Sequence, residues 1–146
     1  MTVPDSLAGK PLQPLLGVAR EVSWRRYSFA ITTGSFPGNC IIQHSVRDAR
    51  FKLIVSAQPG TPNLIAHSYL DESHPNFVVS GAKAADQANL SAQTRAAWDR
   101  WLLPPKCELY DLAADPSEWQ NLADEPQHAA VKADGKWGSG CNWLTN

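Results

Sequence analysis

The chain has 146 residues, 43% of them hydrophobic and 18% charged, and its formal net charge is −1. This composition is typical of a single globular domain and excludes a disordered or fibrous chain. The near-zero charge provides no field that would attract nucleic acid, and no apolar run approaches the roughly 20 residues of a membrane-spanning helix. We therefore expect neither nucleic acid nor a membrane as a partner. The beginning of the chain lacks the charged and apolar regions of an export signal, which makes the cytoplasm the default location.

The three cysteines, Cys40, Cys107 and Cys141, form no CxxC or CxxH spacing. A zinc site is therefore not expected, and no metal-binding residue is assigned. We favour the interpretation that the cysteines are buried free thiols. The alternative is one disulfide with a spare thiol.

Residues 1–20 predict an extended lead-in rather than a long helix, because Pro11 and Pro14 fix φ and remove hydrogen-bond donors. Residues 21–33, EVSWRRYSFAITT, are rich in β-branched and aromatic side chains and predict a strand. The side chains of this strand that are available for packing are Trp24, Tyr27, Phe29 and Ile31.

Residues 40–57, CIIQHSVRDARFKLIVSA, predict a β-hairpin whose turn centres on Asp48 and Ala49. Alternation along the two strands places one set of side chains on a common face. This set comprises Ile42, His44 and Val46 on the first strand and Phe51, Leu53 and Val55 on the second.

From 58 to 89 the sequence is loop-like, and a surface excursion of this length usually carries function or contacts a neighbour.

Residues 90–105, LSAQTRAAWDRWLLPP, form the clearest helix, with Ser91 suited to the N-cap and a Pro-Pro pair at the end. Trp98 and Trp101 recur at helical spacing in apolar company. We therefore interpret them as core residues rather than as a platform for stacking sugars. The run CELYDL, from 107 to 112, predicts a further strand.

The segment DPSEWQNLA predicts a capping box, in which Asp115 caps the amide of Glu118 and Glu118 reaches back to Asp115. The segment DEPQHAAVKA predicts one more short helix that starts by the same device. No structure is assigned to residues 134–146. These elements together predict an α+β domain, with a small antiparallel sheet of about four strands and helices packed on one face.

Three stretches carry a more specific signal: DSLAGKPLQPLL at 5–16, SVRDARFKLI at 45–54 and ELYDLAADPSEWQNLADEP at 108–126. In this order they resemble segments in the carboxyl-terminal part of sulfatases, and the N-sulfoglucosamine sulfohydrolase (heparan N-sulfatase) type looks most similar. The last stretch is the most specific, since it is similar to the family's ELYDLxxDPxExxNLAxDP ending at almost every position. The sequence departs from the family where His44 and Phe51 stand in place of the frequent Arg and Tyr.

The resemblance implies that residues 1–20 are the trailing segment of a catalytic domain and that 21–133 form the C-terminal subdomain. Residues 134–146 match nothing in the family and are expected to be an irregular tail. It also implies that the nucleophile, a formylglycine in a CxPSR-like context, and the calcium ion belong to the larger domain. None of the three cysteines has that context, and the chain contains no Asp-Asp pair. We therefore expect a fragment without catalytic residues, which needs its missing catalytic domain as a partner to hydrolyse sulfate esters or sulfamates. The alternative is a stand-alone small binding or structural module.

Two residues of the hairpin are candidate substrate contacts. The C-terminal subdomain of sulfatases borders the substrate cleft, so the resemblance implies that His44 and Arg47 help to hold a sulfated sugar. Arg suits a sulfate-like oxyanion because its guanidinium donates two parallel hydrogen bonds. The alternative is a surface hairpin in which Arg47, Arg50 and Lys52 are solvated or pair with Asp48. We favour this alternative, because charged side chains on hairpins mostly serve to keep sheet edges soluble.

Overall fold

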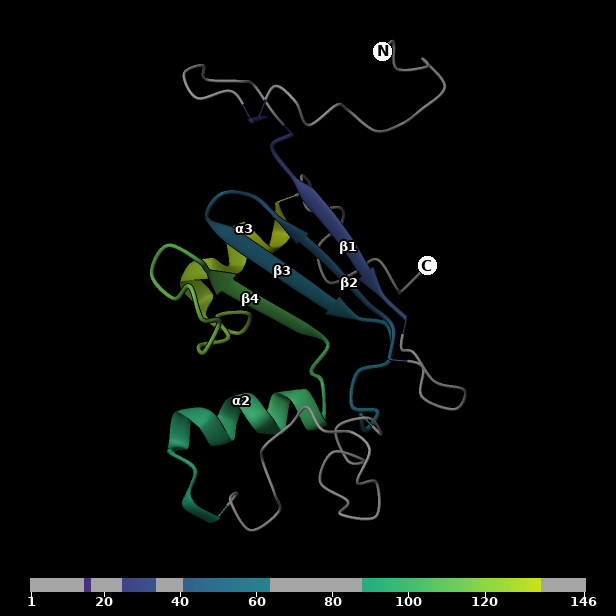
Figure 1. Cartoon of the computed structure of the whole chain (residues 1–146), viewed down its shortest axis with the longest axis vertical. Helices are drawn as coiled ribbons and strands as arrows, with labels where there is room; N and C mark the ends of the chain where they lie inside the picture. The colour runs from purple at the N-terminus through teal and green to yellow at the C-terminus, as the bar shows by residue number, and fades with distance from the viewer. Residues whose placement is uncertain (1–14, 17–24, 34–40, 64–87, 135–146) are drawn as a thin grey trace.

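The computed structural model describes residues 15–16, 25–33, 41–63 and 88–134 (Figure 1). Its centre is a four-stranded antiparallel sheet in the order β1-β2-β3-β4, in which each strand pairs with the next along the chain. The predicted α+β class and four-stranded antiparallel sheet are therefore confirmed. The described elements are β1 Ser28–Thr32, β2 Gln43–Arg47, β3 Phe51–Ser56, α2 Ala92–Leu102, β4 Cys107–Asp111, the 3₁₀ turn η3 Pro126–His128 and α3 Ala129–Ala133.

The hairpin of β2 and β3 turns at Asp48, as the sequence predicts. The carboxylate Oδ1 of Asp48 accepts hydrogen bonds of 2.7 Å from the backbone amides of Arg50 and Phe51. The backbone amide of Asp48 donates to the carbonyl of Phe51 at 3.0 Å. This self-closed turn matches the preference of Asp for such positions, and it sets a register in which Val46 pairs with Leu53.

One face of the sheet carries the hydrophobic core, and the segment after β4 covers part of it. Val46, Leu53 and Leu109 form a cross-strand row on that face, and each is at most 3% exposed. Val131 of α3 packs against this cluster. The core therefore forms from the predicted apolar face of the hairpin, the last strand and the short terminal helix.

The two helices lie on different sides of the sheet, whereas the sequence predicts helices on one face. α3 packs on the core face. Arg100 and Trp101 of α2 instead share a pocket with Ile54 and Glu108, which the alternation along β3 and β4 directs to the opposite face. The apolar stripe of a helix indicates that it packs somewhere, but it does not specify which face of the sheet it meets.

α2 begins where it is predicted, but it does not enter the core. The Ser91 hydroxyl accepts a 3.1 Å hydrogen bond from the amide of Thr94, which confirms the N-cap. No residue of α2 is buried: Trp98 is half-buried and Trp101 is 37% exposed, with ring centroids 4.9 Å apart. The interpretation of both tryptophans as core is therefore wrong, because α2 meets the face of the sheet opposite the core. Figure 1 shows α2 apart from α3, which packs on the core.

The turn after β4 differs from the predicted capping box. The Asp115 carboxylate accepts from the amide of Gln120 at 2.7 Å, and the amide of Glu118 donates to the Asp115 carbonyl instead. Glu118 has a φ of 59°, in the left-handed region that a right-handed helix excludes. Its carboxylate lies 2.6 Å from Lys52 Nζ. The predicted capping box does not form because the Glu118 carboxylate pairs instead with Lys52 on β3, a residue that is remote in sequence.

The following helix is present as η3 and α3, but without the predicted capping device. Glu125 is the N-cap residue of η3 and His128 that of α3, and neither makes a side-chain cap hydrogen bond. The amide of His128 donates to the carbonyl of Glu125 at 3.0 Å. This short helix therefore depends on its packing against the core rather than on its cap.

Cys107 is disulfide-bonded, so the favoured interpretation of free thiols is wrong for this residue. The alternative of one disulfide with a spare thiol fits it. Cys40, Cys141 and Trp24 lie outside the described residues, as do most of the lead-in, most of the long loop and the tail after Asp134. Within the described parts of the chain, no helix has the length and apolar character that crossing a membrane requires.

Candidate functional site

His44 and Arg47, the two predicted substrate contacts, both lie on β2 but face different sides of the sheet. In the register His44 pairs with Val55 and is half-buried, whereas Arg47 pairs with Lys52 and is exposed. Side chains three residues apart on a strand point to opposite faces. The structure therefore does not bring the two residues into one site.

Arg47 lines an open pocket at the turn of the hairpin, which we call the arginine pocket. Its volume is about 590 Å³. Asp48 is the one acidic side chain among its described lining residues, and its Oδ1 is already engaged by the turn. The pocket is therefore positively charged and suited to an anion. It is lined by Arg25, Arg26, Ser28, Arg47, Asp48, Ala49 and Arg50.

The arginines of this pocket differ in how they are held. Arg50 donates through Nε and Nη2 to Asp111 Oδ2 at 3.0 and 2.7 Å, and this hydrogen bonding lowers the pKa of Asp111 and raises the pKa of Arg50. The guanidinium of Arg26 lies over the ring of Tyr27 at 5.3 Å. The guanidinium of Arg47 makes no hydrogen bond or ion pair with any other described residue. Its donors, like those of Arg26, are therefore available to a ligand.

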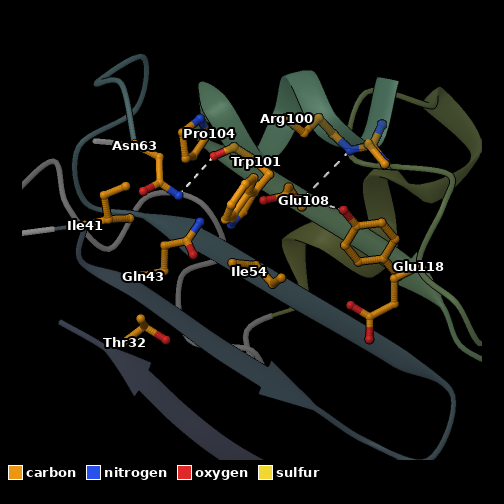
Figure 2. Close-up of a pocket in the computed structure, with 12 residues that line it drawn as sticks. Thr32, Ile41, Gln43, Ile54, Asn63, Arg100, Trp101, Pro104, Glu108 and Glu118 are labelled. Atoms are coloured by element: carbon orange, nitrogen blue, oxygen red, sulfur yellow. Dashed lines mark hydrogen bonds and ion pairs between the residues drawn. The ribbon is translucent and has the colours of Figure 1, made fainter. Parts of the chain in front are cut away.

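A second pocket, which we call the α2 pocket, lies between α2 and the face of the sheet opposite the core. Its volume is about 420 Å³. Figure 2 shows Trp101 reaching from α2 towards Ile54 and Gln43, with Glu108 and Arg100 beside it. It is lined by Thr32, Ile41, Gln43, Ile54, Asn63, Ala97, Arg100, Trp101, Pro104, Glu108, Tyr110 and Glu118.

Glu108 is the most perturbed acid of the α2 pocket. It is 9% exposed, its Oε2 accepts a short hydrogen bond from the Tyr110 hydroxyl, and Arg100 Nε lies 4.0 Å away. Burial raises the pKa of Glu108, although Tyr110 and Arg100 oppose the shift, and burial likewise raises the pKa of Tyr110. Arg100 is anchored by a 2.5 Å hydrogen bond from Nη2 to the Trp119 carbonyl. Perturbed acids in concave sites are candidates for function.

Sequence reasoning missed the α2 pocket, although part of its signal is present. In the strand CELYD, alternation sends Glu108 and Tyr110 to the face opposite Leu109, so a polar face was visible. The alternation along the strand does not show that Arg100 and Trp101 of the preceding helix cover that face. Such contacts depend on how the chain returns from the helix to β4.

Among the described residues, neither pocket offers a set of ligands for a metal ion. The described parts of the chain contain no group of three or more His, Cys, Asp or Glu residues placed to hold an ion. The acids of the α2 pocket are instead engaged by cations and a hydroxyl: Glu118 by Lys52, and Glu108 by Tyr110 and Arg100. A hard cation such as calcium requires six or more oxygen ligands, and these residues do not fit it.

Comparison with known proteins yields structural similarity only. No protein-family model and no curated protein sequence matches this chain. A protein from Bacteroides thetaiotaomicron VPI-5482 that is assigned as a sulfatase is similar in structure, with a TM-score of 0.55 and 18% identity over 93% of this chain and 20% of its own. The chain has the fold of a sulfatase segment.

A second similar structure is BT4656, solved in complex with its substrate D-glucosamine-2-N,6-O-disulfate. The TM-score is 0.49 and the identity 18%, over 89% of this chain and 18% of that protein. The chain therefore spans about a fifth of the length of the solved sulfatase structures to which it is similar.

Proposed function

We propose that this chain is the C-terminal subdomain of a sulfatase-type hydrolase that acts on sulfate esters or sulfamates of sugars, and that the enzyme is of the N-sulfoglucosamine sulfohydrolase type. Two observations support the proposal. The chain shares its fold with about a fifth of a larger sulfatase. The stretch from 108 to 126 is similar to the family's ending at almost every position.

The observation that carries the proposal is an uncovered apolar surface on β1, which we call the β1 face. Phe29 and Ile31 are 65% and 59% exposed, although the register aligns them with Val46 and His44 on the core side of the sheet. Burying one such side chain is worth about 1.5–3 kcal/mol. Exposed apolar patches mark interaction sites. The occupant we propose is the catalytic domain of the same enzyme.

In this proposal the reacting groups belong to that partner domain. The formylglycine nucleophile and the calcium ion lie there, and the described residues of this chain offer no set of ligands for calcium. The chain alone is therefore inactive. Its own contribution is to hold the substrate at the shared boundary.

Arg47 is the residue to which we assign substrate contact. Arg47 is exposed, its guanidinium makes no ion pair with an acid among the described residues, and other arginines surround it in the arginine pocket. A guanidinium matches the oxygen geometry of a sulfate group. His44 faces the core side of β2, and the proposal assigns it no part in this pocket.

The exposed β1 face provides the test. The purified chain is expected to bind a hydrophobic dye and to self-associate, and to show no turnover of 4-nitrocatechol sulfate. Replacing Phe29 and Ile31 together by serine should reduce dye fluorescence and association, measured by fluorescence titration and analytical ultracentrifugation.

The control is Leu103→Ser, which removes a side chain that is 52% exposed at the end of α2, outside the β1 face. It should leave both readouts close to those of the unmodified chain. A monomer that binds no dye would contradict the proposal and support a stand-alone module. Measurable turnover would contradict the assignment of the reacting groups to a missing domain.

A further inference from the structure

The two pockets lie on the same face of the sheet. Ser28 and Arg47 line the arginine pocket and Tyr110 lines the α2 pocket. All three belong to one cross-strand row, Ser28–Arg47–Lys52–Tyr110, and therefore point to one face. Arg47 and Gln43, which lines the α2 pocket, lie four residues apart on β2, a separation of about 13 Å along the strand. A glycan of a few linked sugar rings spans this distance.

Lys52, which joins the pockets in this row, is not an additional anion site. Its Nζ lies 2.6 Å from Glu118 Oε2, and the two side chains are 25% and 30% exposed. The positive charge of the row is therefore concentrated on the β1 side, at the arginine pocket. On the β4 side the charges of Lys52 and Arg100 are offset by Glu118 and Glu108.

The α2 pocket offers hydrogen-bonding groups beside an aromatic side chain. The side-chain amide of Gln43 has no hydrogen bond to another described residue. Glu108 Oε1 has none either, because Tyr110 and Arg100 both approach Oε2. Trp101 is 37% exposed and extends from α2 over Gln43 and Ile54, as Figure 2 shows. A pocket of about 420 Å³ with these groups has the size and mixed lining of a small-molecule site.

We propose that the α2 pocket binds a neutral sugar ring of the same glycan whose sulfated sugar Arg47 holds. The indole of Trp101 covers the apolar face of the ring, while Gln43 and Glu108 bond to its hydroxyl groups. The inference rests on the proposed function, since it places a second unit of the same sulfated glycan in the α2 pocket.

The chemistry of the pocket selects a neutral ring over an ion. An anion would meet the carboxylates of Glu108 and Glu118, and a cation would meet Arg100 and Lys52. A hydroxyl both donates and accepts hydrogen bonds, so it fits an amide beside a carboxylate oxygen.

The test is an NMR titration of the isotopically labelled chain with N-acetyl-D-glucosamine and, separately, with sodium sulfate. The sugar should shift the indole resonance of Trp101 and the side-chain amide of Gln43 in a saturable manner. Trp101→Ala should weaken sugar binding about tenfold or more, equivalent to about 1.4 kcal/mol. Gln43→Ala should weaken it without disturbing the Trp98–Trp101 contact. Sulfate should shift resonances around Arg47, and Arg47→Ala should abolish that effect.

Trp119→Ala is the matched control, because Trp119 is 38% exposed and lies outside the pocket. It should leave sugar affinity unchanged. Equal weakening by Trp101→Ala and Trp119→Ala, or shifts that do not saturate, would overturn the inference. A response to sulfate without one to the sugar would overturn it while supporting the proposed function. A saturable response to the sugar without one to sulfate would support the pocket and remove the role proposed for Arg47.

Discussion

Glu108 is a charged residue in a strand whose inward neighbours form the core. Its position is tolerated because Tyr110, two residues later on the same face, donates to it and Arg100 approaches from α2. Burial nevertheless dominates, so the pKa of Glu108 is raised. Folding thus favours the protonated form of this side chain. Its stabilising effect is complete below the usual glutamate pKa of about 4.3 and is lost as pH rises through the raised value.

We therefore expect Glu108→Gln to be more stable than the wild type at pH 7 and to lose that advantage at pH 4. The amide resembles the protonated acid and carries no charge to desolvate. Tyr110→Phe should act in the opposite direction, because the carboxylate then loses its donor at neutral pH. Urea unfolding of the three proteins at the two pH values measures both effects. A Gln variant that is less stable at pH 7 would contradict the assignment.

At the scale of elements, the two edge strands of the sheet differ in what lies beside them. The outer edge of β4 is closed by the turn that follows it: the Asn121 side chain accepts from the amide of Leu109 at 2.9 Å and donates to the carbonyl of Cys107 at 3.2 Å. The amide of Leu122 donates to the Leu109 carbonyl at 2.8 Å. The Asn-Leu pair thus takes the place of a fifth strand. β1, at the other edge, is exposed along its length, and open edges invite pairing with another chain.

Asn121→Ala should destabilise the chain by about 2–3 kcal/mol, because it leaves the buried amide of Leu109 without an acceptor. Asn121→Asp keeps the acceptor oxygen for Leu109 and Ala123 but loses the donor to Cys107, so its effect should be smaller. Gln120→Ala, at the exposed neighbouring position, is the control. Chemical denaturation gives the three values. Equal losses for the Ala and Asp variants would contradict the role of the acceptor oxygen.

At the scale of the whole molecule, the two faces of the sheet are covered unevenly. α3 covers part of the core face, α2 and its pocket lie over the opposite face, and the β1 face, on the core side, is exposed. The disulfide of Cys107 ties the start of β4 to a distant part of the chain. A cross-link of this kind stabilises a small domain mainly by restricting its unfolded state.

The disulfide predicts how many of the cysteines react as free thiols before and after reduction. Of the three cysteines, one should react with a thiol reagent after denaturation without reductant, and all three after reduction. Reduction should lower the free energy of unfolding by about 2–4 kcal/mol. Quantitative thiol labelling followed by mass spectrometry gives the count. Three reactive thiols before reduction would contradict the cross-link.

The sequence by itself determined the local features of this protein: the period-two strands, the hairpin turn at Asp48 and the N-cap at Ser91. These depend on side chains a few residues apart, so their physics is contained in the pattern. It also carried the similarity to sulfatases, whose fold the chain shares over 93% of its length. The domain boundaries drawn from that similarity stay predictions.

Only the tertiary structure decided which faces and partners these elements meet. It separated His44 from Arg47, placed Glu118 against Lys52 rather than in a capping box, and moved Trp101 from the expected core to the wall of a pocket. Each of these outcomes joins groups that are remote in sequence or depends on which side of the sheet a segment crosses. The alternation of side chains defines two faces, but the packing of the whole chain determines what covers each of them.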